Sequence, residues 1–561
     1  MTDMKHIKPF RAAAVQTLAT LGDVSENIRL LEHYTREAVR RGAKLVVFPE
    51  CMNTGYLFDS IGHARELAEP LDGPYATAMK KLARQYGLHI ASGFTELGAN
   101  GEVFNSGLLF DPSGSLVLHY QKQFLATHDQ NWFAWGENGC PVVDTELGRL
   151  GLLICFDGRI PEIARTLALQ KVDVVVDMAN FFAMDQADLW TPARAWENGF
   201  WIIAGTKAGV ERSIYYPGGS MIVDPEGQIH SYIDWDDHGV ACADIEPMAS
   251  RKKCWEGGGD RMLDRRSELY GIIAKPVDET PAGEILKEPI IPAEATAKAA
   301  AVQAHLTKSP DSLTAALDMV EHAARLGVKL IALPQFSNAD DWLPDERSAR
   351  EASQRTEEVL DHLSGVCSRW RCTVVAPVVE AERGSLYSTA FVIGTDGAIQ
   401  GKYRQSHVEP ECRSWCTPGG DLPVFETEWG RFGILLGYDG RFPETARVLA
   451  LAGADAIVWS VGWRDARDRT LLATPKAEDN RIFLIAANRT DTPYPGGSLV
   501  IPPTGFPDWD LNRVAPRQKR HGAVMPGFMN LALARQKMMI PGVDMLANRF
   551  IATYSDLVES A

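Results

Sequence analysis

The second half of this chain repeats the first. Ala301-Val-Gln303 matches Ala14-Val-Gln16, and Tyr494-Pro-Gly-Gly-Ser498 matches Tyr216-Pro-Gly-Gly-Ser220. Further segments recur in the same order at separations between 278 and 287 residues. A repeat of this length is far longer than the period of a solenoid and indicates a duplicated domain. A chain of 561 residues is also too long for one hydrophobic core, so we expect two domains.

The composition places the boundary between the two copies. Residues 276–298 hold four prolines and several acids, which is typical of a linker. We therefore predict a first domain over residues 1–275, this linker, and a second domain over residues 299–561. Residues 505–546 interrupt the second copy with an irregular stretch rich in Arg and Met, to which we assign no role.

Alternating helix and strand patterns run through both halves. Ser25 opens a helical segment with apolar residues at Ile28 and Leu31, and Gly42 ends it. An apolar strand pattern follows at residues 45–49. This alternation predicts the α/β class.

Cys155 stands where a predicted buried strand meets a predicted helix. The apolar run at residues 150–154 is typical of a buried strand, and Pro161 is favoured at the first position of a helix. The partial positive charge of a helix N-terminus stabilises a thiolate, so we interpret Cys155 as an accessible nucleophile. A buried and inert cysteine is the alternative that this spacing leaves open.

Two more predicted strands end in charged residues. Glu50 ends the strand at residues 45–49, and Lys122 follows a strand-like stretch. Glu, Lys and Cys in this order resemble the catalytic triad of the nitrilase, or carbon–nitrogen hydrolase, superfamily. The resemblance covers residues 8–272 almost continuously.

Longer motifs strengthen the resemblance. Cys155-Phe-Asp-Gly-Arg-Ile-Pro-Glu162 is similar to the CxDxRxPE signature of the family, and Arg265-Arg-Ser-Glu-Leu-Tyr270 is similar to the motif that closes its domains. The resemblance implies two four-layer αββα sandwich domains. Single-domain relatives usually dimerise by stacking their sandwiches, so it also implies that the two copies pack as an internal pseudo-dimer, with further homo-oligomers left open.

The resemblance also assigns roles to residues. Cys155 would attack an amide carbonyl after Glu50 takes its proton, while Lys122 and the backbone N–H of Phe156 would stabilise the oxyanion. Water activated by Glu50 would then hydrolyse the thioester. The alternative for Glu50 and Lys122 is a buried ion pair without a catalytic part.

A second carboxylate near the site is usual in this family. Asp129 lies where similar carbamoylases carry Glu, and its side chain is one methylene shorter. A solvated loop aspartate is the alternative. Glu137 is the second choice, although its place beside a turn glycine suits a surface residue better.

Fewer signals bear on the substrate. Arg159 lies where hydrolases of carbamoyl amino acids place an arginine that can bind a carboxylate with two hydrogen bonds. Its repetition as Arg441 in the second copy favours a structural role instead. Asn180, Phe181 and Phe182 follow a predicted strand and are expected to line the pocket, with core packing as the alternative for the two phenylalanines.

The two copies differ where chemistry would occur. Gln335 and Gly437 stand at the positions of the glutamate and the cysteine. A neutral amide cannot act as a general base and glycine offers no nucleophile, so we predict that the second copy is inactive. We match Lys402 with Lys122 and expect it to remain as a structural ion-pair residue.

Composition excludes several other classes. The formal charge of −16, with no stripe of Lys and Arg, argues against nucleic-acid binding. No apolar run reaches membrane-spanning length and no signal sequence is evident, and the nine scattered cysteines do not form a disulfide framework, so we expect a cytoplasmic protein. We expect no cofactor and no metal. His407, Cys412 and Cys416 have the wrong spacing for zinc and lack a fourth ligand.

These observations predict a cysteine-dependent hydrolase of small molecules. It would cleave a non-peptide C–N bond of a small amide or N-carbamoyl compound and release ammonia. Phe156 and Asp157 favour amides, because nitrilases that act on nitriles usually have Trp and Glu there. A nitrilase, or a binding or scaffold protein that has lost activity, remains the alternative.

Overall fold

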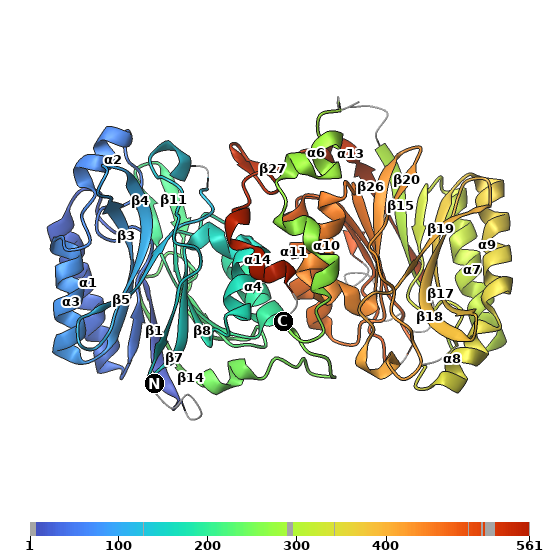
Figure 1. The fold of residues 1–561 in the computed structure, drawn as a ribbon, viewed down its shortest axis with the longest axis horizontal. Helices are drawn as coiled ribbons and strands as arrows, with labels where there is room; N and C mark the ends of the chain where they lie inside the picture. Colours follow the sequence, from blue (N-terminus) through green and yellow to red (C-terminus); the bar gives the residue numbers. More distant parts are fainter. Residues whose placement is uncertain are drawn as a thin grey trace. The chain divides into compact units, whose positions relative to one another are not determined.

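The computed structural model describes residues 7–126, 128–183, 185–288, 296–340, 343–491, 493–505, 509–510 and 522–559. The chain divides into two compact units (Figure 1). The first comprises Met1–Lys253, Ile540–Val543 and Asn548–Leu557. The second comprises Cys254–Met539, Asp544–Ala547 and Val558–Ala561.

This division differs from the boundary that we predict at residue 275. Residues 254–275 belong to the second unit, and residues 548–557 near the C-terminus belong to the first. Within the second unit, the ring of Trp255 packs edge to face against Tyr438 and Phe442, with centroids 5.4 and 5.7 Å apart. Side-chain packing, and not the order along the chain, therefore determines to which unit these segments belong.

The first unit is a four-layer αββα sandwich. Its two six-stranded sheets have the orders β14-β1-β2-β3-β4-β5 and β13-β12-β9-β8-β7-β6, and they face one another. Helices α1 and α3 cover the outer face of the first sheet, and α4 and α5 cover that of the second (Figure 1). The elements are β1 (Phe10–Gln16), α1 (Val24–Arg40), β2 (Leu45–Val47), α2 (Ile61–Leu67), α3 (Pro74–Tyr86), β3 (His89–Leu97), β4 (Val103–Phe110), β5 (Leu116–Gln121), β6 (Val142–Thr145), β7 (Gly148–Leu153), α4 (Pro161–Leu169), β8 (Val174–Ala179), α5 (Thr191–Asn198), β9 (Trp201–Thr206), β10 (Ala208–Glu211), β11 (Ile214–Pro217), β12 (Met221–Val223), β13 (Ile229–Tyr232) and β14 (Gly239–Ile245).

The second unit repeats this topology. Its sheets have the orders β19-β18-β17-β16-β15-β26 and β20-β21-β22-β23-β24-β25, which match the two sheets of the first unit strand by strand. The duplication predicted from the sequence is thus confirmed as a repeated fold. The elements of the second unit are α6 (Pro281–Ile285), β15 (Thr296–Gln303), α7 (Pro310–Arg325), β16 (Leu330–Ala332), α8 (Glu346–Ser353), α9 (Thr356–Trp370), β17 (Thr373–Glu382), β18 (Ser385–Ile393), β19 (Ile399–Arg404), β20 (Val424–Thr427), β21 (Gly430–Leu436), α10 (Pro443–Leu451), β22 (Ala456–Ser460), α11 (Thr474–Asn480), β23 (Phe483–Ala487), β24 (Leu499–Ile501), β25 (Trp509–Asp510), β26 (Ala523–Asn530) and α13 (Leu531–Arg535). The residues of three short C-terminal elements are divided between the two units: β27 (Met538–Ile540), β28 (Val543–Asp544) and α14 (Ser555–Val558), which belongs to the first unit except for Val558.

The stretch at residues 505–546 is more regular than we predict. Its strand β26 pairs antiparallel with β15 along its full length, from Ala523 to Asn530, and so takes the place that β14 has in the first unit. Residues 506–508 and 511–521 of this stretch lie outside the described residues.

Local sequence explains where the helices begin. The helix predicted at Ser25 is confirmed as α1. It is capped by Asp23, whose carboxylate accepts a hydrogen bond from the backbone N–H of Glu26 at 2.9 Å. Such a cap satisfies one of the N–H groups that a helix start leaves without a partner. Leu31 and Ala38 on the inner face are fully buried.

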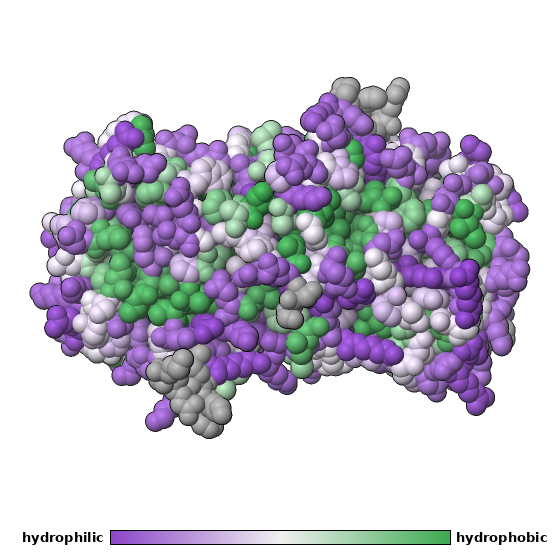
Figure 2. All heavy atoms as spheres, viewed as in Figure 1, coloured by the Kyte–Doolittle hydropathy of each residue, from purple (hydrophilic) through white to green (hydrophobic). Residues whose placement is uncertain are grey.

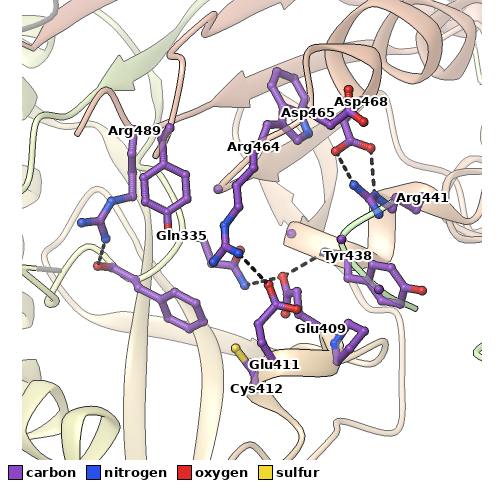
Figure 3. Close-up of a pocket in the computed structure, with 18 of the residues that line it drawn as sticks. Gln335, Glu409, Glu411, Cys412, Tyr438, Arg441, Arg464, Asp465, Asp468 and Arg489 are labelled. Carbon is purple, nitrogen blue, oxygen red and sulfur yellow. Dashed lines mark hydrogen bonds and ion pairs between the residues drawn. The ribbon is translucent and has the colours of Figure 1, made fainter. Parts of the chain in front are cut away.

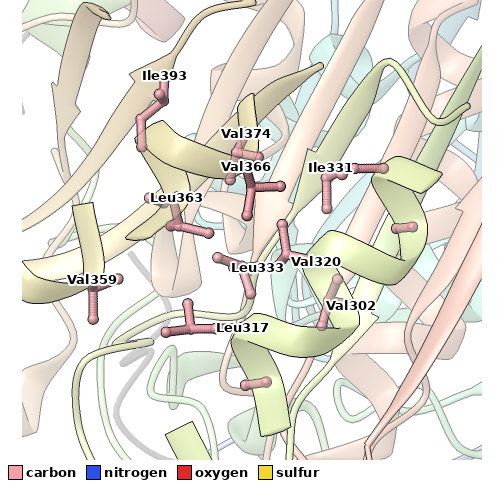
Figure 4. Packing of buried hydrophobic residues seen from close by; sticks show 14 of the residues in the cluster. Val302, Leu317, Val320, Ile331, Leu333, Val359, Leu363, Val366, Val374 and Ile393 are labelled. Carbon is pink, nitrogen blue, oxygen red and sulfur yellow. The ribbon is translucent and has the colours of Figure 1, made fainter. Parts of the chain in front are cut away.

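Apolar side chains between helices and sheet form the core of each unit. In the second unit, Val320 of α7 and Leu363 and Val366 of α9 pack on Ile331 and Val374 of the sheet (Figure 4). All five are at most 3% exposed. Burial of such a side chain contributes about 1.5–3 kcal/mol to stability.

Polar side chains cover much of the face shown in Figure 2, in keeping with the high net charge. Among the described residues, no helix combines the length and the apolar composition that a membrane span requires. The predicted packing of the two copies as a pseudo-dimer concerns the relative placement of the units and stays a prediction.

Candidate active site

A buried lysine lies between two carboxylates in the first unit. The Lys122 Nζ is 2.8 Å from the Glu50 Oε1 and 2.8 Å from the Asp129 Oδ2. None of the three side chains is more than 1% exposed. The structure therefore brings Glu50 and Lys122 together as the sequence predicts, and it adds Asp129. The alternative of a solvated aspartate at position 129 is wrong.

Backbone contacts hold Glu50 beside the second sheet. It follows β2, and its N–H donates to the carbonyl of Ala179 at the end of β8, at 3.3 Å. The chain passes so close to β3 that a Cβ at Gly93 would lie 2.3 Å from the Glu50 Cα. A side chain at position 93 would thus displace the glutamate.

Two polar residues that sequence reasoning missed orient the carboxylates. Asn105 donates from Nδ2 to Glu50 Oε1 at 2.6 Å, and the Tyr56 hydroxyl donates to Asp129 Oδ1 at 2.8 Å. The backbone N–H of Ala126 donates to the other Asp129 oxygen at 2.8 Å. An asparagine within the largely apolar strand β4 was the sequence signal for Asn105.

Mutual electrostatics shift the pKa values of this cluster. Burial raises the pKa of Glu50, and Asp129 adds to the effect, although Lys122 opposes it. Burial would lower the pKa of Lys122, but the two carboxylates raise it well above its usual value. Lys122 is therefore a fixed positive charge, and Glu50 is a stronger base than an ordinary carboxylate.

Cys155 lies on the predicted tight turn between strand and helix. Its φ of 53° is in the left-handed region, and a short 3₁₀ turn over Cys155–Arg159 leads into α4. Its backbone N–H donates to Asp177 Oδ1 at 2.9 Å, and its thiol donates to the carbonyl of Asn180 at 3.5 Å. Cys51, directly after Glu50, also has a positive φ, and strained backbone of this kind is often found at functional sites.

The predicted exposure and thiolate character of Cys155 are wrong. The residue is 2% exposed. Burial, together with the nearby Glu50 carboxylate, raises the pKa of the thiol well above its usual value, although Lys122 opposes this. The helix charge that favours a thiolate is outweighed by the loss of solvent around the sulfur.

The turn also presents a free backbone donor. Among the described residues, the N–H of Phe156 donates to no acceptor. Asp157 holds the turn in place, because its carboxylate accepts hydrogen bonds from the backbone N–H of Phe124 and of Ile154 and from the hydroxyl of Tyr120.

Arg159 is held by protein groups. Its Nη2 is 2.9 Å from Asp185 Oδ1, and its guanidinium lies 4.4 Å from the ring centre of Trp190. The side chain is 6% exposed. These contacts agree with the structural alternative.

The three residues after β8 differ in position. Asn180 is fully buried, and among the described residues neither its Nδ2 nor its Oδ1 has a hydrogen-bond partner. Phe181 is 1% exposed, whereas Phe182 is 37% exposed. Phe182 packs against Tyr56 and Tyr216. Phe182 is thus the more accessible of the two rings, and the Asn180 side chain is a buried amide without a hydrogen-bond partner among the described residues.

Strand register corrects the match that we predict for Lys122. Leu108 pairs with His119 in the first unit, and Phe391 pairs with Lys402 in the second, so Lys402 is the counterpart of His119. Lys402 is partly exposed and forms ion pairs with Glu380 and Glu382. Lys402 therefore forms the structural ion pairs that we expect, but it is not the counterpart of Lys122.

Gln405 occupies the position of Lys122 in the second unit. Lys122 lies three positions after His119, and Gln405 lies three positions after Lys402. Two positions before Lys122 and Gln405, a tyrosine in each unit donates a hydrogen bond to an equivalent aspartate. The lysine is thus replaced, along with the glutamate and the cysteine of the first unit.

A carboxylate from a new position fills the equivalent site. Glu409 Oε1 accepts hydrogen bonds from Gln335 Nε2 at 3.0 Å and from the backbone N–H of Tyr438 at 3.1 Å. That N–H corresponds to the free one of Phe156. A Cβ at Gly437 would lie 1.9 Å from Glu409 Oε1. Glu409 thus occupies the space that a nucleophile and its oxyanion would need.

The described residues contain no group of three or more His, Cys, Asp or Glu side chains arranged to hold a metal ion. Two αββα sandwiches, one of which carries a buried cysteine on a strand-to-helix turn, define the nitrilase class of fold. The carbon-nitrogen hydrolase family model matches residues 11–252 and 298–506, and this chain belongs to that family.

Individual relatives match one copy's length. The chain is 32% identical over 262 residues to a protein named nitrilase from Pyrococcus abyssi, which covers 46% of this chain and 98% of the relative. It is 32% identical over 263 residues to a deaminated glutathione amidase from Synechocystis sp., covering 43% and 93%. The solved structure of an amidase from Nesterenkonia sp. aligns with 23% identity over 48% of this chain and 98% of that one, with a TM-score of 0.40.

Proposed function

We propose that the first unit hydrolyses a non-peptide C–N bond of a small amide or N-carbamoyl compound through a thioester on Cys155, and releases ammonia. The buried cluster of Glu50, Lys122 and Asp129 beside this thiol carries the proposal. Membership of the carbon-nitrogen hydrolase family supports the reaction class. The amidases among the relatives support the choice of amides.

Acylation begins from a neutral thiol. Because the pKa of Cys155 is raised, a base must remove its proton as sulfur attacks the carbonyl carbon, and Glu50 is the carboxylate whose charge the thiol senses most. The oxyanion would be stabilised by the Lys122 ammonium and the free N–H of Phe156. Glu50 then gives the proton to the leaving nitrogen, and ammonia departs as the C–N bond breaks.

Deacylation reverses the proton path. Water attacks the thioester carbonyl while Glu50 accepts a proton from it, and the S–C bond breaks with the proton returning to sulfur. An amide yields an acid. An N-carbamoyl compound yields an amine and carbon dioxide after its carbamate decomposes.

Asp129 takes the part of a positioning residue. Its carboxylate forms a second ion pair with Lys122, in addition to that of Glu50, and is itself fixed by Tyr56 and by the backbone N–H of Ala126. The ammonium therefore keeps one position while charge develops on the substrate. The shorter side chain of aspartate, compared with the usual glutamate, is compatible with this contact.

The substrate is expected to be neutral. Arg159 is occupied by Asp185 and Trp190, so it does not offer a guanidinium to an acidic substrate. Phe182 and Tyr56 instead supply aromatic surface. The side-chain amide of Asn180 has no partner among the described residues, and the backbone carbonyl of the same residue accepts from the Cys155 thiol, so we assign this side chain to binding of the substrate amide.

A substrate panel tests the proposal. Small neutral amides, N-carbamoyl amino acids and nitriles are incubated with the wild type and with Cys155→Ala, and ammonia is measured. We expect turnover of neutral amides and a loss of at least about a thousandfold in the variant. Turnover of nitriles alone would make the protein a nitrilase in the strict sense. No turnover of any compound would favour the binding or scaffold alternative.

A further inference from the structure

The second unit has a cavity where the first has its cysteine and carboxylates. Its volume is about 110 Å³. Glu409, Gln335 and Gly437 line it, together with three arginines and several aromatic rings (Figure 3). All of its lining residues belong to the second unit. Glu409 thus occupies the position of the nucleophile and forms part of the wall of the space beside it.

Glu409 is the one charged side chain of the lining for which the described residues supply no opposite charge. Its oxygens accept only from neutral donors, namely Gln335, Gln405 and the Tyr438 backbone. The other lining charges are all paired. These pairs are Arg441 with Asp468, Arg464 with Glu411, Arg489 with Asp491, and Arg467 with both Asp465 and Glu256.

Comparison with the first unit shows what is missing. There Lys122 places its ammonium 2.8 Å from each of two carboxylates. In the second unit Gln405 stands at that position and donates a neutral amide to Glu409 at 2.9 Å. Glu409 is partly buried, and a partly buried carboxylate without a counter-ion is destabilising, so we expect an added cation to bind best here.

The cavity wall also suits an organic cation. Phe336, Trp459, Trp463 and Tyr494 all line it, and the rings of Trp459 and Trp463 meet edge to face with centroids 5.0 Å apart. Aromatic faces attract ammonium groups as well as apolar carbon. The positive charge of Arg464 would repel a bound cation, but the ion pair of Arg464 with Glu411 at 3.4 Å offsets this repulsion.

We propose that this cavity binds a small organic ammonium cation, whose charged group pairs with Glu409 and whose carbon chain packs on the aromatic wall. A cavity of about 150 Å³ accommodates benzene, so the present one fits a chain of about four or five heavy atoms. The site is separate from the proposed hydrolysis in the first unit, and its occupation does not depend on that reaction.

Calorimetric titration of the full-length protein with n-butylamine tests this. We expect binding that weakens at least tenfold in Glu409→Gln, which removes the charge and keeps an acceptor. 1-Butanol and butyrate, which match the chain but lack the positive charge, should bind at least tenfold more weakly than the amine. Because burial raises the pKa of Glu409 to about 7, binding should tighten as the pH rises from 6 to 8.

Two variants locate the site. Asp465→Asn removes the same charge from a lining residue that is paired with Arg467, and Glu50→Gln removes a carboxylate from the first unit. Both should bind n-butylamine within about threefold of the wild type, and circular dichroism shows whether each variant is folded. The proposal is overturned by an absence of amine binding in the wild type, by equal affinity in Glu409→Gln, or by tighter binding of butyrate.

Discussion

The thiol of Cys155 illustrates how burial decides chemistry at the scale of one residue. A helix start would favour a thiolate, yet burial and Glu50 raise the pKa of this thiol. We therefore expect the thiol to be neutral at pH 7, with Glu50, beside Lys122, as the base that takes its proton. A neutral thiol is protected from adventitious reagents, and it becomes a nucleophile only as the proton moves.

This state predicts the order of alkylation. Of the nine cysteines, all of which are described, Cys254 is the exposed one. Iodoacetamide at pH 7 should modify Cys254 before Cys155, as read by mass spectrometry of peptides. Glu50→Gln should speed the alkylation of Cys155, because the carboxylate that raises its pKa is gone while Lys122 remains. The same variant should lose at least about a thousandfold in amide hydrolysis. Slower alkylation in Glu50→Gln would contradict this account.

Asp177 links the turn at Cys155 to protein stability. Burial raises its pKa to about 7, and its carboxylate accepts the N–H of Cys155. A carboxyl with a raised pKa binds its proton more tightly in the folded state, so its contribution to stability falls as the pH rises from about 4 to 7. Asp177→Asn removes this pH-dependent loss of stability and keeps a hydrogen-bond acceptor for the N–H of Cys155. Its melting temperature relative to wild type should therefore be higher at pH 7.5 than at pH 5. A difference that does not change with pH would show that Asp177 titrates normally.

At the scale of elements, the same strand-to-helix turn serves two outcomes. In the first unit it carries Cys155 and a free N–H. In the second, the corresponding N–H of Tyr438 is taken by Glu409, which enters from the segment after β19. One side chain on a neighbouring loop thus closes a site whose backbone is still formed.

Restoring two residues should therefore not restore the second site. Gln335→Glu with Gly437→Cys, made in a Cys155→Ala background, should show no ammonia release. The new Cβ would meet the Glu409 carboxylate at 1.9 Å, and Gln405 still lacks the ammonium of Lys122. The matched control is Cys155→Ala alone. Clear turnover in the triple variant would show that Glu409 moves aside readily.

At the scale of the whole molecule, each compact unit contains a segment from the other half of the chain. Residues 548–557 belong to the first unit, where the Thr553 hydroxyl donates to the Gln123 side chain at 3.2 Å. Gln130 donates to the carbonyl of Gly542 at 2.6 Å. These two glutamines adjoin Lys122 and Asp129 in sequence, so the C-terminal segment supports the part of the chain that carries both.

Removal of residues 548–561 should destabilise the first unit. Tyr554 and Leu557 are fully buried, and loss of each such side chain costs about 1.5–3 kcal/mol. We expect a lower melting temperature and a kcat for amide hydrolysis reduced at least about tenfold, since displacement of Lys122 by about an angstrom is enough for a large loss. Removal of residues 1–6 is the control. Unchanged activity in the shorter chain would make the segment dispensable.

The sequence by itself determined the duplication, the α/β class, and two of the three replacements at the triad positions. These follow from local signals: apolar periodicity, a helix start at Ser25, and the identity of Gln335 and Gly437. Glu50 and Lys122 could also be predicted from the sequence, because each follows a recognisable strand and charged residues at strand ends meet at one edge of a sheet.

Only the tertiary structure decided the rest. The strand register shows that Gln405, and not Lys402, is the counterpart of Lys122. A fixed offset between the two copies misses this match, because short insertions and deletions shift the positions. Burial reversed the expected ionisation of Cys155, and long-range packing moved residues 254–275 into the second unit. No sequence signal indicated that Glu409 occupies the position of the nucleophile in the second unit. Such features depend on which side chains are excluded from water together, and that is a property of the folded chain alone.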